Sequence, residues 1–363
     1  MKTFFLRYQK MHIWLLTALA AIALFHLLKG SRAVMNGLTE WITQPLKTLL
    51  GTVCSVVPFS VAEGLIFASV GILVLYMVSF AAALVRGRGE RKRIFYRRTL
   101  GLLCAMLSVY ALFCILWGAN YYTDDFEHRS GIYAKSVSEE QLTDVTRLFV
   151  ERLNGLAHEV PRTEEGVFNV PRDEIYAAAP DIYDAVEERY PFLEMHDHVP
   201  KRIMSSKFMS ETNFTGFFFP FTGEANLNDH SPACLLPSTI AHELAHQRGI
   251  ASEQECNFLA VLVCETSGDA AYEYSGALFG FIHLSNALYR ADRQAWEALH
   301  EELTMEVRMD LHYNNLYWDQ FESATGDISH EVYDRFLKGY GEESGIQSYG
   351  EVVDLLVAYY GEK

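Results

Sequence analysis

Cysteine is scarce in this 363-residue sequence, which contains only six. Three of them, Cys54, Cys104 and Cys114, lie in or near apolar runs within the first 118 residues. The other three lie in the rest of the chain, where a disulfide is chemically possible but an odd count leaves one thiol over. The sequence therefore assigns no pairing among Cys234, Cys256 and Cys264.

Basic residues are scarce after the first third of the chain. Residues 1–118 hold 13 Lys and Arg beside three Asp and Glu, whereas residues 119–363 hold 17 basic and 43 acidic residues. The first segment thus has a net charge of +10 and the second of −26. Nucleic acid is disfavoured as a partner, because phosphate contacts need clustered Lys and Arg. The asymmetry instead predicts a membrane anchor over 1–118 and a separate acidic domain over 119–363.

Repeats and long apolar runs are absent after residue 118. Candidate helices there offer apolar runs of only about a dozen residues, such as 276–288, too short to cross roughly 30 Å of hydrocarbon. Three longer runs lie earlier and predict transmembrane helices over about 13–29, 64–85 and 100–118. A lipid bilayer is therefore expected around the anchor, and any chemistry of the later domain is expected to take place in water.

Seven basic residues between the second and third apolar runs set the expected orientation. Such dense basic segments stay on the cytoplasmic side of a membrane. Lys2, Arg7 and Lys10 agree with a cytoplasmic amino terminus, so three crossings place the carboxy-terminal domain outside the cytoplasm. This placement depends on the first run crossing the membrane.

Periodicity predicts a mainly helical α+β fold for the second domain. Ser138 and Gln141 have the spacing of a capping box before an amphipathic helix that runs to about residue 157. Two β-prone runs, 202–209 and 214–219, are divided by a polar turn and predict a small sheet. Helices are expected over 238–248, 253–265, 270–290, 294–322 with a possible break, 329–338 and 349–360.

The strongest chemical signal is the pattern His-Glu-x-x-His formed by His242, Glu243 and His246. Its helix is expected to begin after Pro237, with Ser238 as the amino-terminal cap. Residues four apart on a helix point the same way, so both imidazoles can bind one Zn²⁺ ion while Glu243 reaches the water beside it. A catalytic zinc has three protein ligands and one open position, so a third ligand is required.

Glu253 is the expected third ligand. Gly249 can end the first helix by reversing the chain. Ser252 and Glu255 then have the spacing of a second capping box, in which the Glu255 side chain folds back onto its own helix. This assignment leaves Glu253 free to bind the metal.

Asn257 and two alternative ligands complete the expected site. Asn257 lies one helical turn after Glu253 and could hold a ligand histidine through a hydrogen bond to its other nitrogen. Glu255 remains open as the ligand, because helix placement alone does not exclude it. Glu265 also remains open, since its separation of 19 residues from His246 occurs in some zinc peptidases.

Five further residues are candidates for substrate binding. Phe218 and Phe219 are most simply part of a buried strand, but an edge strand there could pair with an extended peptide beside the metal. Glu224 and Asn226 would then rim the cleft. Tyr274 could donate to the oxyanion of a tetrahedral intermediate, although most tyrosines here are expected to be packing residues.

Several motifs together resemble a known family. They are Trp117–Tyr121, Pro220–Asn226, His242–Gly249, Glu253–Phe258, Tyr274–Gly276 and Ser348–Leu355. In combination they are similar to bacterial multi-pass membrane proteins grouped as a family of unknown function with a zincin-like metallopeptidase signature. Cys256 stands where such families usually have Ala. Glu253 followed by Asn257 is similar to the ligand Glu and later Asp of several zincin families.

The resemblance implies a zinc site and an anchor in a bacterial cell membrane, but no physiological reaction. With the residues above, it predicts a zinc-dependent metallopeptidase that hydrolyses peptide or related amide bonds of a peptide or protein substrate outside the cytoplasm. The alternative is a non-enzymatic receptor or scaffold with a structural zinc site. Structural sites usually have four protein ligands and need no general base, so Glu243 favours the enzyme.

Overall fold

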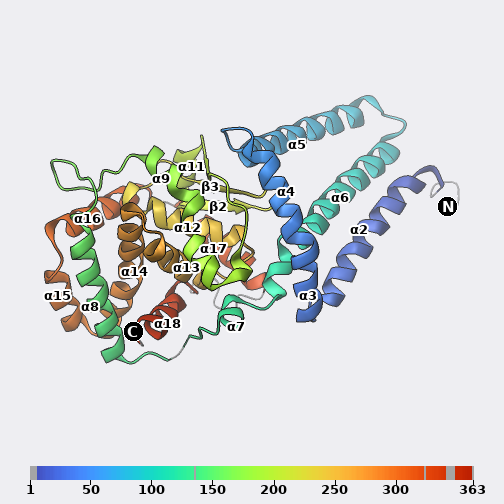
Figure 1. The fold of residues 1–363 in the computed structure, drawn as a ribbon. Helices are drawn as coiled ribbons and strands as arrows, with labels where there is room; N and C mark the ends of the chain where they lie inside the picture. The colour runs from blue at the N-terminus through green and yellow to red at the C-terminus, as the bar shows by residue number, and fades with distance from the viewer. Residues whose placement is uncertain (1–5, 135, 323, 341–347, 362–363) are drawn as a thin grey trace. The chain divides into compact units, whose positions relative to one another are not determined.

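The computed structural model of the chain describes residues 6–134, 136–322, 324–340 and 348–361 (Figure 1). It divides into two compact units. The first comprises Met1–Leu50, Val61–Thr123 and Pro220–Thr222, and the second comprises Gly51–Ser60, Asp124–Phe219 and Gly223–Lys363. The segment Gly51–Ser60, which directly precedes an apolar helix, thus belongs to the second unit.

Three helices of the first unit are long and apolar enough to cross a membrane. They are α2 (Gln9–Leu28), α5 (Val61–Arg86) and α6 (Arg91–Leu116). A helix of about 20 residues rises roughly 30 Å, which matches a hydrocarbon layer. The expectation of three candidate spans is confirmed. Each helix begins before its predicted apolar run, because flanking straight-chain residues such as Lys and Arg also favour helix. α2 and α6 end one and two residues before the predicted limits.

A shorter helical segment connects the first two candidate spans. It consists of α3 (Arg32–Leu38), the π-helical turn η1 (Thr39–Thr43) and α4 (Gln44–Ser55). Thr43 Oγ1 donates to the carbonyl of Ile115 at 2.6 Å and ties this segment to the end of α6. A short 3₁₀ helix, η2 (Gly118–Tyr122), follows α6.

The second unit is mainly helical, as expected. The capping box at the start of α8 is present: Ser138 Oγ accepts from the Gln141 N–H, and the Gln141 side chain accepts from the Ser138 N–H. The helix predicted over 294–322 with a possible break is divided into α15 and α16, with the break at residues 302–304. The helices are α7 (Phe126–Ser130), α8 (Glu139–Leu156), α9 (Arg172–Ala178), η3 (Ala179–Asp181), α10 (Asp184–Arg189), η4 (Pro191–Leu193), α11 (Ser206–Glu211), η5 (Ala233–Leu235), α12 (Leu236–Gln247), α13 (Glu253–Thr266), α14 (Ala270–Ala291), α15 (Arg293–Glu301), α16 (Met305–Asp319), α17 (Ala324–Tyr340) and α18 (Ser348–Tyr360).

The core of the second unit forms around α12, α13 and α14, with α8 and α18 packed against them (Figure 1). α13 contributes an almost continuous buried run from Cys256 to Cys264. All six cysteines of the chain are buried and free. The fold therefore gains its stability from packing of apolar side chains rather than from disulfides.

A three-stranded sheet lies beside α12. Its order is β1 (Lys201–Arg202), β3 (Glu224–Leu227) and β2 (Gly216–Phe219). β3 pairs in parallel with β1 and antiparallel with β2, and the β2 register places Phe217 opposite Asn226. β2 is thus an edge strand among the described residues.

The prediction of a strand over 202–209 is wrong beyond its first residue. The run continues into α11, where the Ser206 and Ser210 hydroxyls donate to backbone carbonyls of the preceding turn. Asn213 then takes a positive φ of 59° before β2 begins. The missed partner of β2 is β3, whose sequence Glu-Ala-Asn-Leu alternates polar and apolar residues over only four positions, a run at the lower limit of a strand signal.

Candidate metal centre

Helix α12 carries the His-Glu-x-x-His pattern. It begins at Leu236, before the predicted start, and Pro237 lies in its first turn, where a missing N–H breaks no helical hydrogen bond. Ser238 is therefore not the cap: its N–H donates to Ser275 Oγ at 3.0 Å from within the helix. As predicted, Gly249 follows the helix end in a left-handed conformation, with φ 93°.

The side chains of His242, His246 and Glu253 converge on one point, with ligand atoms that all lie within 4.8 Å of one another. Glu253 Oε2 is 3.2 Å from His242 Nε2, and its Oε1 is 3.5 Å from His246 Nε2. Around a tetrahedral zinc with bonds of about 2.0–2.1 Å, neighbouring ligand atoms are about 3.3 Å apart. The two distances from Glu253 match this spacing, and two imidazoles with a carboxylate form a donor set that zinc takes.

The electrostatics of this cluster favour a positive charge at its centre. Burial lowers the pKa of His246, but Cys256 and Glu253 outweigh it and raise that pKa well above its usual range. Burial raises the pKa of Glu253, yet His246 and His242 bring it well below its usual value. A proton and a divalent cation compete for such a position, so metal binding would release protons.

Glu255, the first alternative ligand, bonds elsewhere. Its Oε1 accepts the backbone N–H of Glu127 at 3.0 Å, at the start of α7. Burial raises the pKa of Glu255 to about 8. The capping box predicted between Ser252 and Glu255 is absent, since Ser252 makes no side-chain cap hydrogen bond. The carboxylate that was expected to cap its own helix instead caps a different one.

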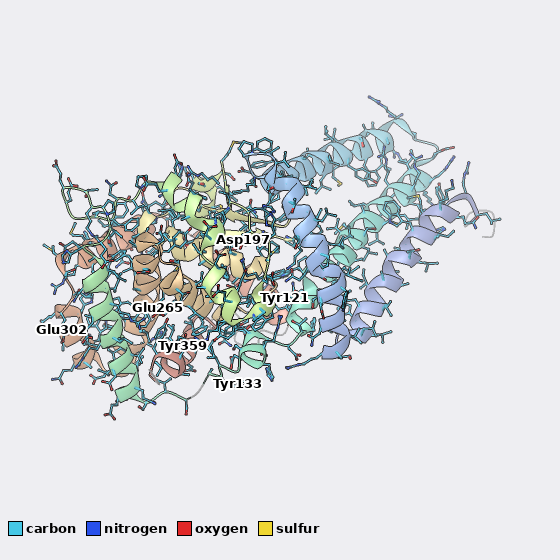
Figure 2. All side chains as sticks on the ribbon, in the orientation of Figure 1. Tyr121, Tyr133, Asp197, Glu265, Glu302 and Tyr359 are labelled. Atoms are coloured by element: carbon cyan, nitrogen blue, oxygen red, sulfur yellow. The ribbon has the colours of Figure 1, made fainter. Side chains whose placement is uncertain are left out.

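Glu265, the second alternative, lies at the other end of α13 (Figure 2). It pairs with Arg152 of α8 at 2.7 Å and accepts a hydrogen bond from the Tyr360 hydroxyl. Among the described residues, Glu253 is therefore the carboxylate that joins the two histidines.

Asn257 does not orient His246 as predicted. The Nδ1 of His246 lies 2.8 Å from the carbonyl of Ile250 and 3.3 Å from Cys256 Sγ. Donation from Nδ1 to the carbonyl selects the tautomer whose Nε2 carries the lone pair that a metal requires. The Asn257 Nδ2 is buried without a hydrogen-bond partner. The tight turn after Gly249 brings the Ile250 carbonyl to the imidazole, and this carbonyl takes the place that was predicted for the Asn257 amide.

Glu243 points toward β2, where the Phe218 N–H bonds to its carboxylate. Burial raises the pKa of Glu243, while His242 and His246 oppose that shift. Its Oε2 is buried and has no hydrogen-bond partner. The side chain thus presents one unpaired oxygen next to the ligand cluster, as a residue that accepts a proton from water requires.

Gly216 makes room for Glu243 and was not identified from the sequence. A Cβ atom at this position would lie 2.8 Å from both Cγ and Oε1 of Glu243, which is closer than side chains approach. A glycine within a strand often marks such an approach by another group, and this was the available signal.

Gly216→Ala is expected to displace the Glu243 carboxylate without disturbing the ligands. A shift of about 1 Å in a catalytic group can cost roughly 100-fold in rate, so any hydrolysis that depends on Glu243 is expected to fall by that order. The measurement is the rate of that hydrolysis together with the metal content. Gly155→Ala, in α8 with nothing near its added Cβ, is the matched control and should keep full activity. An unchanged rate in Gly216→Ala would show that the position of Glu243 does not matter.

Tyr333 of α17 is a second residue that the sequence did not single out. Its hydroxyl donates to Glu253 Oε1, so it lies beside the metal ligands. The sequence contains 20 tyrosines, and no local pattern distinguishes Tyr333 from the others. It also lies 80 residues after Glu253, so its spacing does not indicate the contact. The predicted oxyanion donor, Tyr274, is instead buried and bonded to Asp310 Oδ2 at 2.5 Å. That prediction is therefore wrong for Tyr274, and Tyr333 is the phenol near the centre.

The residues predicted to bind substrate have different surroundings. Phe218 and Phe219 are partly exposed on the edge strand β2, so their role remains a prediction. Glu224 and Asn226 are 4% and 0% exposed in the central strand β3. Glu224 lines a small pocket with Lys201 and Gln247, and none of the three converging ligands lines that pocket. The Asn226 amide donates to the Glu224 carbonyl and its oxygen accepts from Ser60, which makes it a structural link.

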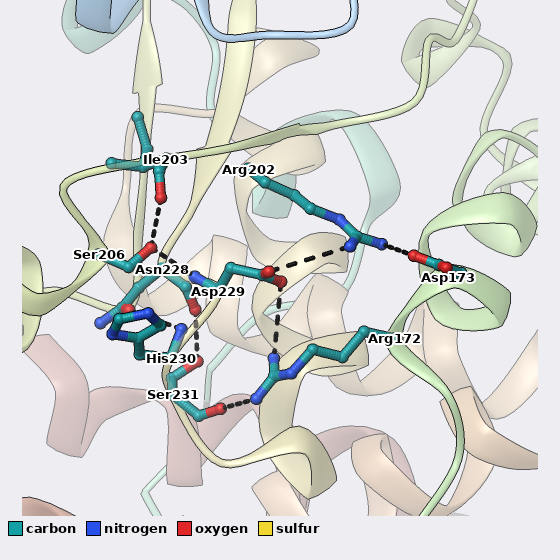
Figure 3. Close-up of polar contacts among 9 residues, drawn as sticks. All are labelled: Arg172, Asp173, Arg202, Ile203, Ser206, Asn228, Asp229, His230 and Ser231. Carbon is teal, nitrogen blue, oxygen red and sulfur yellow. Dashed lines mark hydrogen bonds and ion pairs between the residues drawn. The ribbon is translucent and has the colours of Figure 1, made fainter.

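A polar cluster fixes the loop that leads from β3 to α12 (Figure 3). The carboxylate of Asp229 lies 3.8 Å from Arg172 and 3.9 Å from Arg202. The Asp229 N–H donates to Ser206 Oγ at 2.9 Å, and Arg172 also donates to the Ser231 carbonyl. This loop precedes the helix that carries both histidines, so the cluster helps to set the start of α12.

Arg248 fixes the other end of α12. Its fully buried guanidinium donates to Glu187 at 2.7 Å and to Asp197 at 2.5 Å (Asp197 is labelled in Figure 2). It also lies 3.6 Å above the centre of the Tyr183 ring. Buried charges persist only when paired in this way. With both ends held, α12 presents its two histidines in a defined geometry before any ligand binds.

A family described as "Protein of unknown function (DUF3810)" matches residues 37–357 of the chain. The chain belongs to this family. The match to DUF3810 includes α5, α6 and every residue of the candidate metal centre. No curated protein and no solved structure matches the chain. The DUF3810 description assigns no activity, so the zincin-like metallopeptidase part of the resemblance remains a prediction.

Proposed function

We propose that this protein is a membrane-anchored, zinc-dependent peptidase that hydrolyses peptide or related amide bonds. The observation that carries the proposal is the spacing of His242, His246 and Glu253, which fits a tetrahedral zinc with one open position. The unpaired oxygen of Glu243 beside this cluster favours catalysis over a structural site. A receptor or scaffold would have no use for that oxygen.

Each residue has a distinct role in the proposed reaction. His242, His246 and Glu253 would hold the ion, which when bound acidifies water and polarises the scissile carbonyl. Glu243 accepts the proton from the attacking water and returns it to the leaving amine. The Phe218 N–H holds the Glu243 carboxylate in place during both transfers. The Tyr333 hydroxyl is near enough to donate to an oxyanion after it releases Glu253.

The edge strand β2 supports a peptide as the substrate. An extended peptide can add to an edge strand through backbone hydrogen bonds. The Gly216 end of β2 packs against Glu243, so a peptide on this edge would pass the candidate metal centre. Phe218 and Phe219 would then contact side chains of the bound peptide.

The basic segment between α5 and α6 supports an extracytoplasmic site in a bacterial cell membrane. Seven Lys and Arg residues lie over 86–98, and such segments stay in the cytoplasm. With three crossings, the second unit would then lie on the outer side.

The test uses the full chain purified in detergent. We expect about one zinc per chain by elemental analysis, and cleavage of members of a peptide library detected by mass spectrometry. A chelator should abolish cleavage and added zinc should restore it. A protein that neither contains nor takes up zinc, or cleavage that persists in the chelator, would contradict the proposal.

A further inference from the structure

The chain that enters α5 is hydrogen-bonded to the sheet beside the candidate metal centre. Ser60, the residue before α5, donates from Oγ to Asn226 Oδ1 at 2.7 Å, and the two residues are 3% and 0% exposed. The ammonium group of Lys201 in β1 donates to the carbonyl of Val57 in the same segment. The segment that directly precedes α5 is thus held by both β1 and β3.

β3 leads from this connection to the general base. Asn226 lies opposite Phe217, and the next residue, Leu227, lies opposite Gly216. Gly216 packs directly against Glu243. The path from Ser60 to Glu243 thus consists of one hydrogen bond, one step along β3, one step across to β2 and one packing contact. Strands lie about 4.8 Å apart and rise about 3.3 Å per residue, so Ser60 lies within about 20 Å of the Glu243 carboxylate.

A second connection runs from the end of α6. Nine residues separate Leu116 from α7, and nine extended residues reach at most about 30 Å. The N–H of Glu127 in α7 bonds to Glu255, which is two residues from the ligand Glu253. The centre is therefore bonded on two sides to segments that lead into candidate spans.

Both connections reach the same side of the membrane. Only four residues, 87–90, join α5 to α6, and the two helices contact each other. Two helices joined by so short a loop run antiparallel. The beginning of α5 and the end of α6 therefore lie at one bilayer surface.

From these connections we infer that the substrate is a membrane-anchored polypeptide, cleaved next to its own anchor and within about 20 Å of the bilayer surface. This inference rests on the proposed peptidase function. A substrate held in the same membrane as the enzyme gains effective concentration, provided that its scissile bond can reach the site. A scissile bond held far above the bilayer surface cannot reach the site and loses this increase in effective concentration. A free peptide never has the increase, because it is not held in the membrane.

The experiment compares three substrates with one cleavable sequence in vesicles that contain the full-length protein. In the first, about five flexible residues join the sequence to a membrane helix; in the second, a helical spacer of about 40 residues lifts it roughly 60 Å. The third is the free peptide. We expect the first to be cleaved at least tenfold faster than the other two. Equal or faster cleavage with the spacer would overturn the inference.

The free peptide separates this inference from the proposed function. Zinc-dependent cleavage of the free peptide without any preference for the short anchor refutes the inference alone. If wild-type protein cleaves none of the three, the proposed function fails and the inference fails with it.

A second measurement locates the site without using activity. All six native cysteines are buried, so Thr215→Cys, exposed beside Gly216, accepts a single fluorescent label. Spin-labelled lipid head groups should quench this label at least twofold more than one at Glu302→Cys, at the other end of the second unit (Figure 2). Equal quenching at the two positions would overturn the inference.

Discussion

Glu243→Gln is expected to lower peptide hydrolysis by about 10²- to 10⁴-fold while zinc stays bound. The amide has nearly the shape of the carboxylate, and its oxygen can still accept the Phe218 N–H. It cannot accept a proton from water. Because Glu243 is not one of the three converging ligands, the metal content should not change. Steady-state kcat/KM and elemental analysis of the same preparation measure both quantities.

Glu302→Gln provides the matched control, since Glu302 is exposed and lies outside the candidate metal centre. It should leave both the rate and the zinc content unchanged. Full activity in Glu243→Gln would mean that another group takes the proton. Loss of zinc would place Glu243 among the ligands, and neither result is compatible with the proposed mechanism.

The histidine pair could be predicted from sequence because it depends on helix geometry alone. Residues 242 and 246 share one face of any helix that contains them, whatever packs around it. The sequence also points to Glu253 as the third ligand, but the capping box that supports this prediction does not form. Glu255 does not cap its own helix. It binds the N–H of Glu127, which lies 128 residues earlier, and local spacing gives no sign of such a contact.

The residues that contact the ligands could not be predicted either, because these contacts also join parts of the chain that local sequence patterns do not relate. A backbone carbonyl at Ile250, rather than the side chain of Asn257, meets the imidazole of His246. Gly216 and Tyr333 reach the centre from a strand and a helix that the sequence does not connect to α12. The residue pattern along one helix or strand predicts which of its faces carries the site. The pattern does not predict which other helix or strand packs against that face, because this depends on tertiary packing.

The membrane helices show the opposite case. Whether a helix can enter the hydrocarbon layer depends on its own composition and length rather than on the segments that pack against it. Three candidate spans were therefore predictable, even though each helix begins before its apolar run. The attachment of Gly51–Ser60 to the second unit was not, because hydrogen bonds such as Ser60 to Asn226 join residues far apart in sequence.

Glu253→Ala is expected to reduce bound zinc from about one per chain to less than a tenth. The substitution removes the carboxylate that lies 3.2 and 3.5 Å from the two imidazoles. The two histidines alone supply only two of the four ligands of a tetrahedral zinc, which is too few to hold the ion tightly. Equilibrium dialysis against zinc and elemental analysis measure the loss.

Glu265→Ala distinguishes the alternatives, because it removes a carboxylate of the same helix that pairs with Arg152 instead of the histidines. It should keep its zinc. The thermal midpoint adds a test that does not depend on activity: zinc at about 1,000 times its Kd stabilises a folded protein by roughly 4 kcal/mol. Wild type and Glu265→Ala should therefore melt at a higher temperature when zinc is added, whereas Glu253→Ala should not. A zinc-dependent shift that survives in Glu253→Ala but disappears in Glu265→Ala would transfer the third ligand to Glu265.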